Sequence, residues 1–354
     1  MKVLTLTLYG SLAAGTRQRL MQFVPFFDSE NINIEIEPLL GNSYMMSLAS
    51  GKKQNKIYII RSYVKRLLIL LLRQNYDAVW VQREAFPYLP SFFERLLFVS
   101  GKPVIYDFDD AIFHKYDSHR SRFLRWALGR KLEPLLSGAK LAVCGNDYLA
   151  AYAGRFCKHI VVVPTVVDTS IYVKRCVGDS STLVTIGWIG SPSTWVYVRP
   201  FVEMLSHLAM EEGLVIKIVG AGPQPVGIPN FEFVDWSETT EISEIQSMDI
   251  GIMPLPDELW ARGKCGYKLI QYMACEIPVV ASPVGVNNKI VEHGIDGFLA
   301  TEIDDWKNYL KLLVRSPALR EEMGVRGRNK IIAEYSLQHY GPKLTQYLRE
   351  IERE

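Results

Sequence analysis

The stretch LVTIGWIGSPSTWVYVRPF, residues 183–201, decides the fold. An apolar run ends at Gly190, and the small polar group SPST follows before a second apolar stretch. This order is typical of a buried strand that turns tightly into a helix. The stretch therefore predicts the start of a βα unit in the middle of the chain.

The same order opens the chain in VLTLTLYGSLAAGTRQRL, residues 3–20. Gly10 and Gly15 bracket the turn here, and Thr16 is a candidate N-cap of the helix that follows. Both stretches have the form of Rossmann-type beginnings. A doubled beginning predicts two domains of the same architecture.

Short apolar runs follow each beginning, and each run ends close to a Gly, Pro or Asp. Helical stretches such as 91–99 and 119–136 separate them. Buried strands that alternate with helices predict parallel sheets, and hence an α/β protein with two Rossmann-like domains. The runs are 77–82, 102–108, 139–146 and 159–168 after the first beginning, and 215–223, 231–236, 249–255 and 277–285 after the second.

Length and charge agree with two domains. A chain of 354 residues that is 48% hydrophobic can bury two cores of ordinary size. The polar stretch 172–182 is the predicted linker. Residues 1–172 carry 22 Lys and Arg against 14 Asp and Glu, whereas the remainder carries 18 against 24. The basic first half predicts an anionic partner or surface.

The cellular setting follows from what the sequence lacks. No apolar run approaches the roughly 18 residues needed to span a bilayer, and MKVLTLTLYG resembles a strand rather than a signal peptide. The five cysteines form no C-x-x-C pair, which indicates reduced thiols and no structural zinc. We expect a cytoplasmic protein.

A basic segment, 52–73, interrupts the pattern by interleaving Lys and Arg with Ile and Leu. Such a helix can lie on anionic lipid, and residues 120–131 add four arginines. The alternative is a domain helix that buries 67–72 and leaves its basic face in water. Nucleic acid is not expected, because no platform of stacking aromatic residues accompanies the charges. The basic residues of the first segment are Lys52, Lys53, Lys56, Arg61, Lys65, Arg66 and Arg73.

Residues 261–300, ARGKCGYKLIQYMACEIPVVASPVGVNNKIVEHGIDGFLA, hold the most informative motif. A turn at Gly266 enters a helix, and the strand IPVVAS and the ending HGIDGFLA follow. This stretch resembles the donor-binding signature of family 4 retaining glycosyltransferases. The shorter stretches VQREAFP, YDFDDAIF, VPTVVD, GWIGSPST and VGAGP extend the resemblance over nearly the whole chain.

The resemblance implies a GT-B fold, in which two Rossmann-like domains face each other across a cleft. Residues 1–172 would form the acceptor domain and 173–335 the nucleotide-sugar donor domain. The end of the chain, about 336–354, looks like the family's last helices, which commonly cross back onto the first domain. The implied reaction is transfer of a sugar from a nucleotide diphosphate donor with retention of the anomeric configuration.

The chain departs from the family at two important positions. Most members carry two glutamates eight positions apart, and Gly263 and Gln271 stand there in this chain. The amide oxygen of Gln271 can still accept a hydrogen bond from a ribose hydroxyl. Gly263 offers nothing comparable, so contact with the transferred sugar must come from elsewhere.

The diphosphate also needs partners, because the family's usual Arg and Lys are absent from GWIGSPST. Lys264 and Lys268, four apart and on one face of the predicted helix start, are the candidate substitutes. The alternative is that both are solvated surface lysines. Gly190, Ser191, Ser193 and Thr194 would form the other phosphate cradle, or they would only cap a helix. The resemblance implies that Val234, Asp235 and Trp236 bind the nucleobase of the donor. Trp236 is also a candidate core aromatic.

Acceptor residues are expected at the strand ends of the first domain. Asp109 stands where many family members have a catalytic His, and it would orient the acceptor or take its proton, with Asp107 beside it. Alternatively Asp109 and Asp110 cap the next helix. Arg83, Glu84 and Arg17 are further candidates, for anionic groups and acceptor hydroxyls, and an intradomain ion pair is the alternative for the first two.

We therefore expect a retaining glycosyltransferase that uses a UDP- or GDP-sugar and a glycan or lipid-linked acceptor in bacterial surface polysaccharide synthesis. No metal or cofactor is expected, and the enzyme would sit at the inner face of the cytoplasmic membrane. Two alternatives stay open. One is a metal-dependent enzyme that uses Asp107-Phe108-Asp109 as an Asp-x-Asp site. The other is a non-catalytic nucleotide-sugar binding protein.

Overall fold

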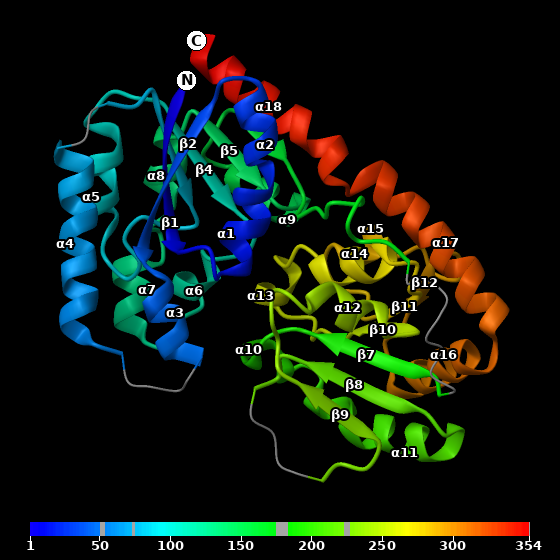
Figure 1. Cartoon of the computed structure of the whole chain (residues 1–354). Coiled ribbons are helices and arrows are strands. Elements are labelled where there is room, and N and C mark those ends of the chain that lie inside the picture. Colours follow the sequence, from blue (N-terminus) through cyan, green and yellow to red (C-terminus); the bar gives the residue numbers. More distant parts are fainter. Residues whose placement is uncertain (50–53, 73–74, 175–182, 223–226, 354) are drawn as a thin grey trace. The chain divides into compact units, whose positions relative to one another are not determined.

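The computed structural model describes residues 1–49, 54–72, 75–174, 183–222 and 227–353. The chain forms two compact units (Figure 1). The first unit consists of Met1–Thr165, Arg262–Cys265 and Tyr340–Glu354. The second consists of Val166–Ala261 and Gly266–His339. Four residues of the signature stretch, Arg262–Cys265, therefore belong to the first unit although both flanking segments belong to the second.

A six-stranded parallel sheet with the order β2-β1-β3-β4-β5-β6 forms the centre of the first unit. All five residues of the central strand β3 are buried, and the strand pairs with β1 and β4 on its two sides. Trp80 in β3 is completely buried and packs edge-on against Phe27. The strands are β1 (Lys2–Tyr9), β2 (Asn33–Leu40), β3 (Ala78–Gln82), β4 (Val104–Phe108), β5 (Leu141–Cys144) and β6 (Ile160–Val162).

The second unit holds another six-stranded parallel sheet, with the order β12-β11-β10-β7-β8-β9. Chain order reverses between β7 and β10, which is the strand arrangement of dinucleotide-binding Rossmann domains. The predicted α/β fold with two Rossmann-like parallel sheets is confirmed. The strands are β7 (Thr185–Ile189), β8 (Val215–Val219), β9 (Phe231–Val234), β10 (Ile250–Met253), β11 (Val279–Ala281) and β12 (Gly297–Leu299).

Helices flank the sheets of both units (Figure 1). Those in the first part of the chain are α1 (Ala14–Arg19), α2 (Val24–Ser29), α3 (Asn42–Ala49), α4 (Lys56–Leu72), α5 (Ser91–Glu94), α6 (His114–Asp117), α7 (Arg122–Leu128), α8 (Glu133–Gly138) and α9 (Asp147–Ala153). Those that follow are α10 (Pro192–Trp195), α11 (Val202–Glu212), α12 (Glu241–Gln246), α13 (Leu259–Arg262), α14 (Tyr267–Ala274), α15 (Asn287–Ile290), α16 (Ile303–Arg315), α17 (Pro317–Glu334) and α18 (Leu337–Arg353).

The division between the units falls at Thr165 and Val166, a few residues before the predicted linker 172–182. Tyr172 lies in the second unit, where Arg328 Nη1 donates a hydrogen bond of 2.7 Å to its carbonyl oxygen. Val167 forms an isolated parallel bridge with Ser336 in the same unit. Most of the linker, 175–182, lies outside the described residues.

Two local predictions are wrong. Thr16 is not an N-cap, because α1 begins at Ala14 with Ala13 as its N-cap, and the Thr16 hydroxyl donates to the carbonyl oxygen of Tyr9. Lys264 does not share a helix face with Lys268, because Gly266 adopts a left-handed conformation with φ of +66° and α14 starts only after it. A residue in that conformation ends any helix that approaches from the N-terminal side.

The basic segment 52–73 also differs from the predicted domain helix that buries 67–72 and leaves its basic face in water. In α4 the charged residue Arg66 is buried, and its Nη2 donates hydrogen bonds of 2.8 Å to the carbonyl oxygens of Thr7 and Glu37. Of the stretch 67–72, Leu70 is buried, whereas Leu68, Leu71 and Leu72 are exposed. Burial of the whole stretch is therefore wrong. Lys52, Lys53 and Arg73 lie outside the described residues, and no helix in the described ranges is long and apolar enough to cross a membrane.

Candidate functional site

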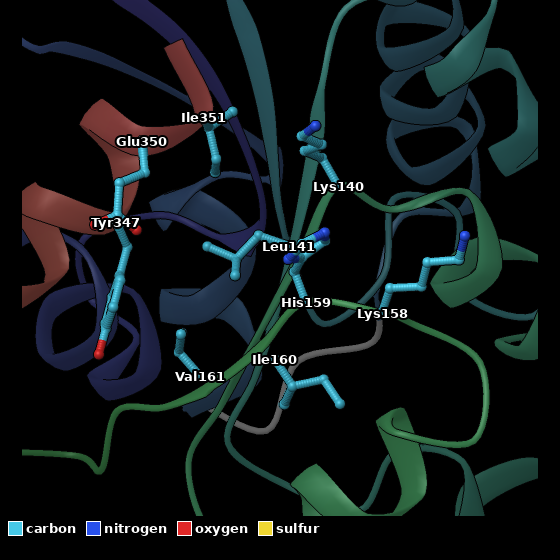
Figure 2. Close-up of a pocket in the computed structure, with 9 residues that line it drawn as sticks. All are labelled: Lys140, Leu141, Lys158, His159, Ile160, Val161, Tyr347, Glu350 and Ile351. Carbon is cyan, nitrogen blue, oxygen red and sulfur yellow. The ribbon is translucent and has the colours of Figure 1, made fainter. Parts of the chain in front are cut away.

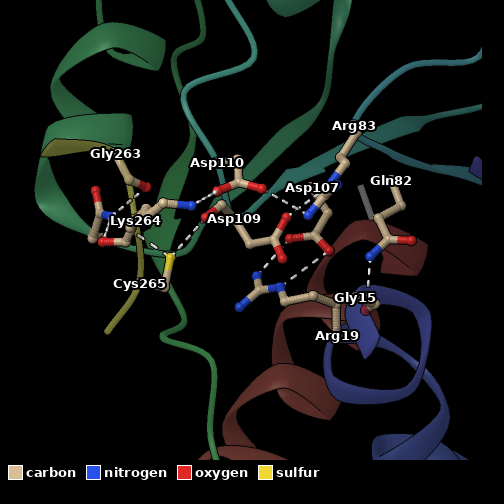
Figure 3. Close-up of polar contacts among 11 residues, drawn as sticks. Gly15, Arg19, Gln82, Arg83, Asp107, Asp109, Asp110, Gly263, Lys264 and Cys265 are labelled. Carbon is tan, nitrogen blue, oxygen red and sulfur yellow. Dashed lines mark hydrogen bonds and ion pairs between the residues drawn. The ribbon is translucent and has the colours of Figure 1, made fainter. Parts of the chain in front are cut away.

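The predicted aspartates of the first unit lie at the carboxyl end of β4, which runs between β3 and β5 (Figure 3). Asp107 is completely buried, and its Oδ1 lies 2.5 Å from Arg19 Nη2. Arg19 also donates to the carbonyl oxygen of Val163. Burial alone would lower the pKa of Arg19, but the charge and hydrogen bond of Asp107, together with the charge of Asp109, outweigh burial and raise it. Asp107 therefore anchors Arg19 within the unit.

Asp109 and Asp110 share one cation, Arg83, which follows β3 directly. Arg83 Nε lies 2.9 Å from Asp109 Oδ1, and Nη2 lies 2.9 Å from Asp110 Oδ2. Neither aspartate is the N-cap of α6, whose N-cap is Phe113. The ion pair that the sequence left open for Arg83 is thus present, and it ties the ends of β3 and β4 together.

The first turn of α1 lies against this ion pair. A Cβ atom on Gly15 would lie 3.5 Å from Arg83 Nη2 and from Gln82 Nε2. Gln82 Nε2 donates a 2.8 Å hydrogen bond to the carbonyl oxygen of Gly15. Arg17, two positions later in α1, donates through Nη1 to the carbonyl oxygens of Ser11 and Leu12 and so braces the loop that precedes the helix.

Electrostatics define what Asp109 can do. Burial acts to raise the pKa of Asp109, but the charge and hydrogen bond of Arg83, together with the charge of Arg19, outweigh burial and hold the pKa below its usual value. A carboxyl group with a lowered pKa is a weak base at neutral pH. Asp109 is therefore suited to accept a hydrogen bond and to orient a hydroxyl.

The segment Arg262–Cys265 completes this cluster (Figure 3). Asn146 Nδ2 donates hydrogen bonds of 3.0 Å and 3.1 Å to the carbonyl oxygens of Gly263 and Lys264. Cys265 Sγ donates to the carbonyl oxygen of Asp109 at 3.0 Å. Lys264 Nζ lies 3.8 Å from Asp110 Oδ1. A cation from the signature stretch thus joins the acidic end of β4.

Glu84 lies away from this cluster, in the core. Its side chain is 3% exposed, and its oxygens accept from Lys131 Nζ at 2.8 Å and Lys115 Nζ at 3.2 Å. Burial acts to raise the pKa of Glu84, but the two lysines outweigh burial and lower it. The structure thus shows the intradomain ion pair that was the alternative for Glu84.

In the second unit, the predicted cradle follows β7 as the short helix α10. Ser191 is its N-cap in a capping box with Thr194, and the Ser191 amide donates to Thr194 Oγ1 at 3.1 Å. Gly190 lies between the end of β7 and Ser191, and a Cβ atom there would lie 2.4 Å from the Trp188 ring. The hydroxyls of Ser191 and Ser193 lie 2.9 Å apart. Helix capping, the alternative to a phosphate cradle, therefore accounts for part of this polar group.

A second polar cluster surrounds Glu241, the first residue of α12. Glu241 Oε2 accepts from Trp236 Nε1 at 2.7 Å. Its Oε1 accepts from the Tyr172 hydroxyl at 2.7 Å and from Gln271 Nε2 at 2.9 Å. Gln271 Nε2 also lies 3.1 Å from the Tyr172 hydroxyl oxygen. The predicted ribose residue and the predicted base residue thus share one carboxylate.

This cluster and the cradle lie at the same edge of the second sheet. Gly220, with φ of +80°, follows β8, and a Cβ atom there would lie 2.4 Å from the Gly190 carbonyl oxygen and 3.0 Å from Trp236 Cβ. Lys268, one turn before Gln271 in α14, holds Nζ 5.6 Å from the centre of the Trp188 ring. Val234 ends β9 half-buried, and Asp235 is exposed.

Comparison with known proteins gives a partial family match and a fold match. Residues 182–315 match the family model of glycosyl transferases group 1. Over 99% of its length the chain superimposes on HepE of Anabaena in complex with UDP-glucose, with a TM-score of 0.73, 15% identity and 100% of that chain covered. The fold is GT-B.

Two other solved structures share the GT-B fold. Sucrose-phosphate synthase of Thermosynechococcus elongatus has a TM-score of 0.70 at 12% identity, with 99% of both chains covered. A glycosyltransferase of Rickettsia africae has a TM-score of 0.69 at 15% identity, with 99% of this chain and 98% of that chain covered. No curated protein sequence matches the chain. At these identities the likeness to solved structures concerns the fold.

Within the GT-B fold the predicted residues form two separate groups. Asp107, Asp109, Arg83 and Lys264 gather at the end of β4 in the first unit. The second group consists of Gly190, Ser191, Thr194, Trp236, Lys268 and Gln271 in the second unit. Among the described residues, no group of three His, Cys, Asp or Glu side chains is arranged to hold a metal ion.

Sequence reasoning missed Asn146 and Glu241. Asn146 could have been found, since it ends the run 139–146 at a strand end, just as Asp107 and Asp109 stand at the end of the run 102–108. Glu241 gave no signal, because it lies 30 positions from Gln271 in a polar helix start. Only the folded chain brings that carboxylate to Trp236 and Gln271.

A pocket of about 260 Å³ lies elsewhere in the first unit (Figure 2). It opens where β5 and β6 begin and includes Lys140, His159 and Glu350, the last from α18. This is the amino end of the parallel sheet, opposite to the aspartates of β4. Parallel sheets bind ligands at their carboxyl ends, so the geometry does not connect this pocket with the candidate site.

Proposed function

We propose that the protein is a glycosyltransferase that moves a sugar from a nucleoside diphosphate donor to a hydroxyl of a glycan or lipid-linked acceptor, with retention of configuration. The observation that carries the proposal is the group of Ser191, Lys268, Trp236 and Gln271 at one edge of the second sheet. This group offers hydroxyls, a cation, an aromatic ring and an amide, which suit a diphosphate, a base and a ribose.

The donor half of the reaction belongs to the second unit. The bond between the sugar C1 and the diphosphate oxygen breaks, and the leaving diphosphate gains negative charge. Lys268 and the hydroxyls of Ser191 and Thr194 would stabilise that charge, because preorganised donors act most strongly where charge develops. HepE structures contain UDP and UDP-glucose, so a UDP-sugar is the first donor to test and a GDP-sugar the second.

The acceptor half belongs to the first unit. Asp109 would accept a hydrogen bond from the attacking hydroxyl while Arg83 keeps Asp109 ionised. The acceptor oxygen bonds to C1 on the face that the diphosphate leaves, and its proton passes to a diphosphate oxygen. This route needs no strong base, which agrees with the lowered pKa of Asp109. Lys264, beside Asp110, would counter negative charge at the same strand end.

We further propose that transfer needs no divalent metal. Both carboxylates of the Asp-x-Asp sequence already have a cation, Arg19 for Asp107 and Arg83 for Asp109. A metal ion would have to displace one of these arginines. Activity that is abolished by EDTA and restored by Mn²⁺ would favour the metal-dependent alternative instead.

A membrane surface is the setting that we propose for the acceptor. The helix α4 exposes a stripe of Ile57, Ile60, Val64, Leu68 and Leu71, which recur every three or four residues. Exposed apolar residues at this spacing, with Lys56, Arg61 and Lys65 on the same helix, are typical of helices that lie on anionic lipid. In α7, Phe123 and Trp126 are 69% and 83% exposed, and each directly follows an arginine, Arg122 or Arg125. Contact at the inner face of the cytoplasmic membrane would fit a lipid-linked acceptor of bacterial surface polysaccharide synthesis.

Calorimetry with UDP, GDP and their sugar derivatives tests the proposed donor. The wild-type protein is expected to bind one of these nucleotides, and Lys268→Ala is expected to weaken binding about tenfold or more, because a charge-assisted contact is lost. Lys307→Ala, on α16, is the matched control and should bind as the wild type does. Binding of no nucleotide by the folded wild-type protein would refute the proposed function.

A further inference from the structure

The carboxylate of Glu241 lies at the centre of the donor group. Three hydrogen bonds of 2.7 to 2.9 Å reach it, from Trp236, Tyr172 and Gln271. A carboxylate accepts hydrogen bonds and cannot donate them. Every polar group that faces Glu241 must therefore direct an N–H or O–H hydrogen-bond donor toward it.

This requirement fixes the amide of Gln271. Oxygen and nitrogen of an amide are distinguished by their partners, and only Nε2 can face the carboxylate. The amide oxygen Oε1 is then directed away from Glu241 and serves as the acceptor of the side chain. A ribose hydroxyl needs such an acceptor. Glu241 thereby sets which atom of Gln271 is offered to a ligand.

The same contact explains why a carboxylate at position 271 does not suit this chain. A glutamate there would place a second carboxylate about as close to Glu241 as the present 2.9 Å contact. Two carboxylates at that distance cannot both ionise without a large cost, so one pKa rises strongly. The nearby Tyr172 hydroxyl carries no positive charge that could offset this repulsion. Burial raises the pKa of Tyr172, so the hydroxyl stays neutral.

We propose that Glu241 is the positioning residue of the nucleoside subsite and supplies, from α12, the negative charge that position 271 lacks. It orients the Gln271 amide toward the ribose and fixes the indole of Trp236 beside the base. The inference rests on the proposed function, because it assigns roles to residues of the same donor site. The ligand class is a ribonucleoside diphosphate or its sugar.

An exchange of the two side chains tests the proposal, with UDP and GDP as the probes in calorimetry. Gln271→Glu is expected to weaken nucleotide binding about 10-fold to 100-fold at pH 8, which is the range for a lost charged hydrogen bond. The loss should shrink at pH 5.5, where the two carboxylates share a proton. The double variant Glu241→Gln/Gln271→Glu restores one amide beside one carboxylate and should bind within about threefold of the wild type.

Matched controls separate this role from a general effect on the fold. Glu244 lies three positions after Glu241 in the same helix and pairs with Lys217 on β8 at 3.1 Å, so Glu244→Gln should leave nucleotide affinity unchanged. The Tm of Gln271→Glu should lie further below the wild-type Tm at pH 8 than at pH 5.5. This readout needs no nucleotide.

Three results would overturn the proposal. They are wild-type affinity in Gln271→Glu at pH 8, a folded double variant that recovers nothing, and a Tm of Gln271→Glu that follows the wild type at both pH values. A wild-type protein that binds no nucleotide while Gln271→Glu still shows the expected Tm shift would refute the proposed function and leave the contact with Glu241 intact.

Discussion

Arg83 Nε lies 2.9 Å from Asp109 Oδ1 although Arg83 has φ of +66°, a backbone conformation that non-glycine residues rarely adopt. The left-handed conformation costs about 1–2 kcal/mol. The Arg83 amide donates to the carbonyl oxygen of Asp107 at 2.7 Å, and the side chain reaches two aspartates. These bonds offset the strain and fix Arg83 at the edge of the sheet.

Replacing Arg83 separates the ion pair from the strain. Arg83→Ala is expected to lower the free energy of unfolding by about 2 kcal/mol at pH 7, because Asp109 loses its charged partner. Arg83→Gly loses the same partner but relieves the backbone, so it should be about 1 kcal/mol more stable than Arg83→Ala. Urea unfolding measures the free energy of unfolding of both variants. If Arg83→Gly is no more stable than Arg83→Ala, the backbone of Arg83 is not strained.

The same pair predicts a pH dependence. Because the pKa of Asp109 is lowered in the folded protein, its ion pair adds stability above the unfolded pKa of about 3.9 and loses that contribution as the pH falls through the folded value. The difference in unfolding free energy between wild type and Arg83→Ala should therefore be full at pH 7 and narrow below about pH 4. A difference that stays constant down to pH 3 would count against an ionised pair.

Gly263 should not tolerate a glutamate, the residue that the resemblance to family 4 glycosyltransferases implies at this position. A Cβ atom there would lie 2.4 Å from Ala111 Cβ and 2.8 Å from the Ala111 amide nitrogen. Gly263→Glu is expected to cost about 2 kcal/mol or more of stability and to add no activity, because the backbone near Asp109 must move. Gly41→Ala is the control, since its nearest contact would be 3.4 Å from the Tyr58 hydroxyl. A Gly263→Glu variant with wild-type Tm and higher turnover would refute this.

Asp107 is expected to matter for stability rather than for chemistry. Asp107→Asn leaves Arg19 buried without its ionised partner and should cost about 3–5 kcal/mol, measured by chemical denaturation. The double variant Arg19→Met/Asp107→Leu removes both charges and should regain most of that loss. If the double variant is no more stable than Asp107→Asn, the buried pair is not the cause.

The exposed stripe on α4 predicts reversible lipid binding. Substituting Ile57, Ile60 and Val64 by Ser should reduce co-sedimentation with vesicles that contain phosphatidylserine about tenfold or more, because apolar area that enters the interface is lost. The Tm should change little, since these side chains contact water. Ile332→Ser, on α17, is an exposed control. Equal binding by the stripe variant and the wild type would argue against membrane contact through α4.

The sequence by itself determined the repeated architecture. Apolar runs that end in Gly or Asp, such as the one through Gly190, sufficed to predict two parallel sheets, because burial on both faces of a parallel strand requires continuous hydrophobicity. Strand ends also pointed to Asp107, Asp109 and Arg83, since ligands bind where parallel strands end.

Only the tertiary structure decided which partners these residues have. Lys264 and Lys268 are four positions apart, yet Gly266 separates them, and Lys264 pairs with Asp110 in the first unit. Glu241 meets Gln271 because α12 and α14 pack together, and nothing in their sequence spacing encodes that contact. Local patterns report strand, turn and burial, whereas the charge that faces a side chain comes from residues far away along the chain.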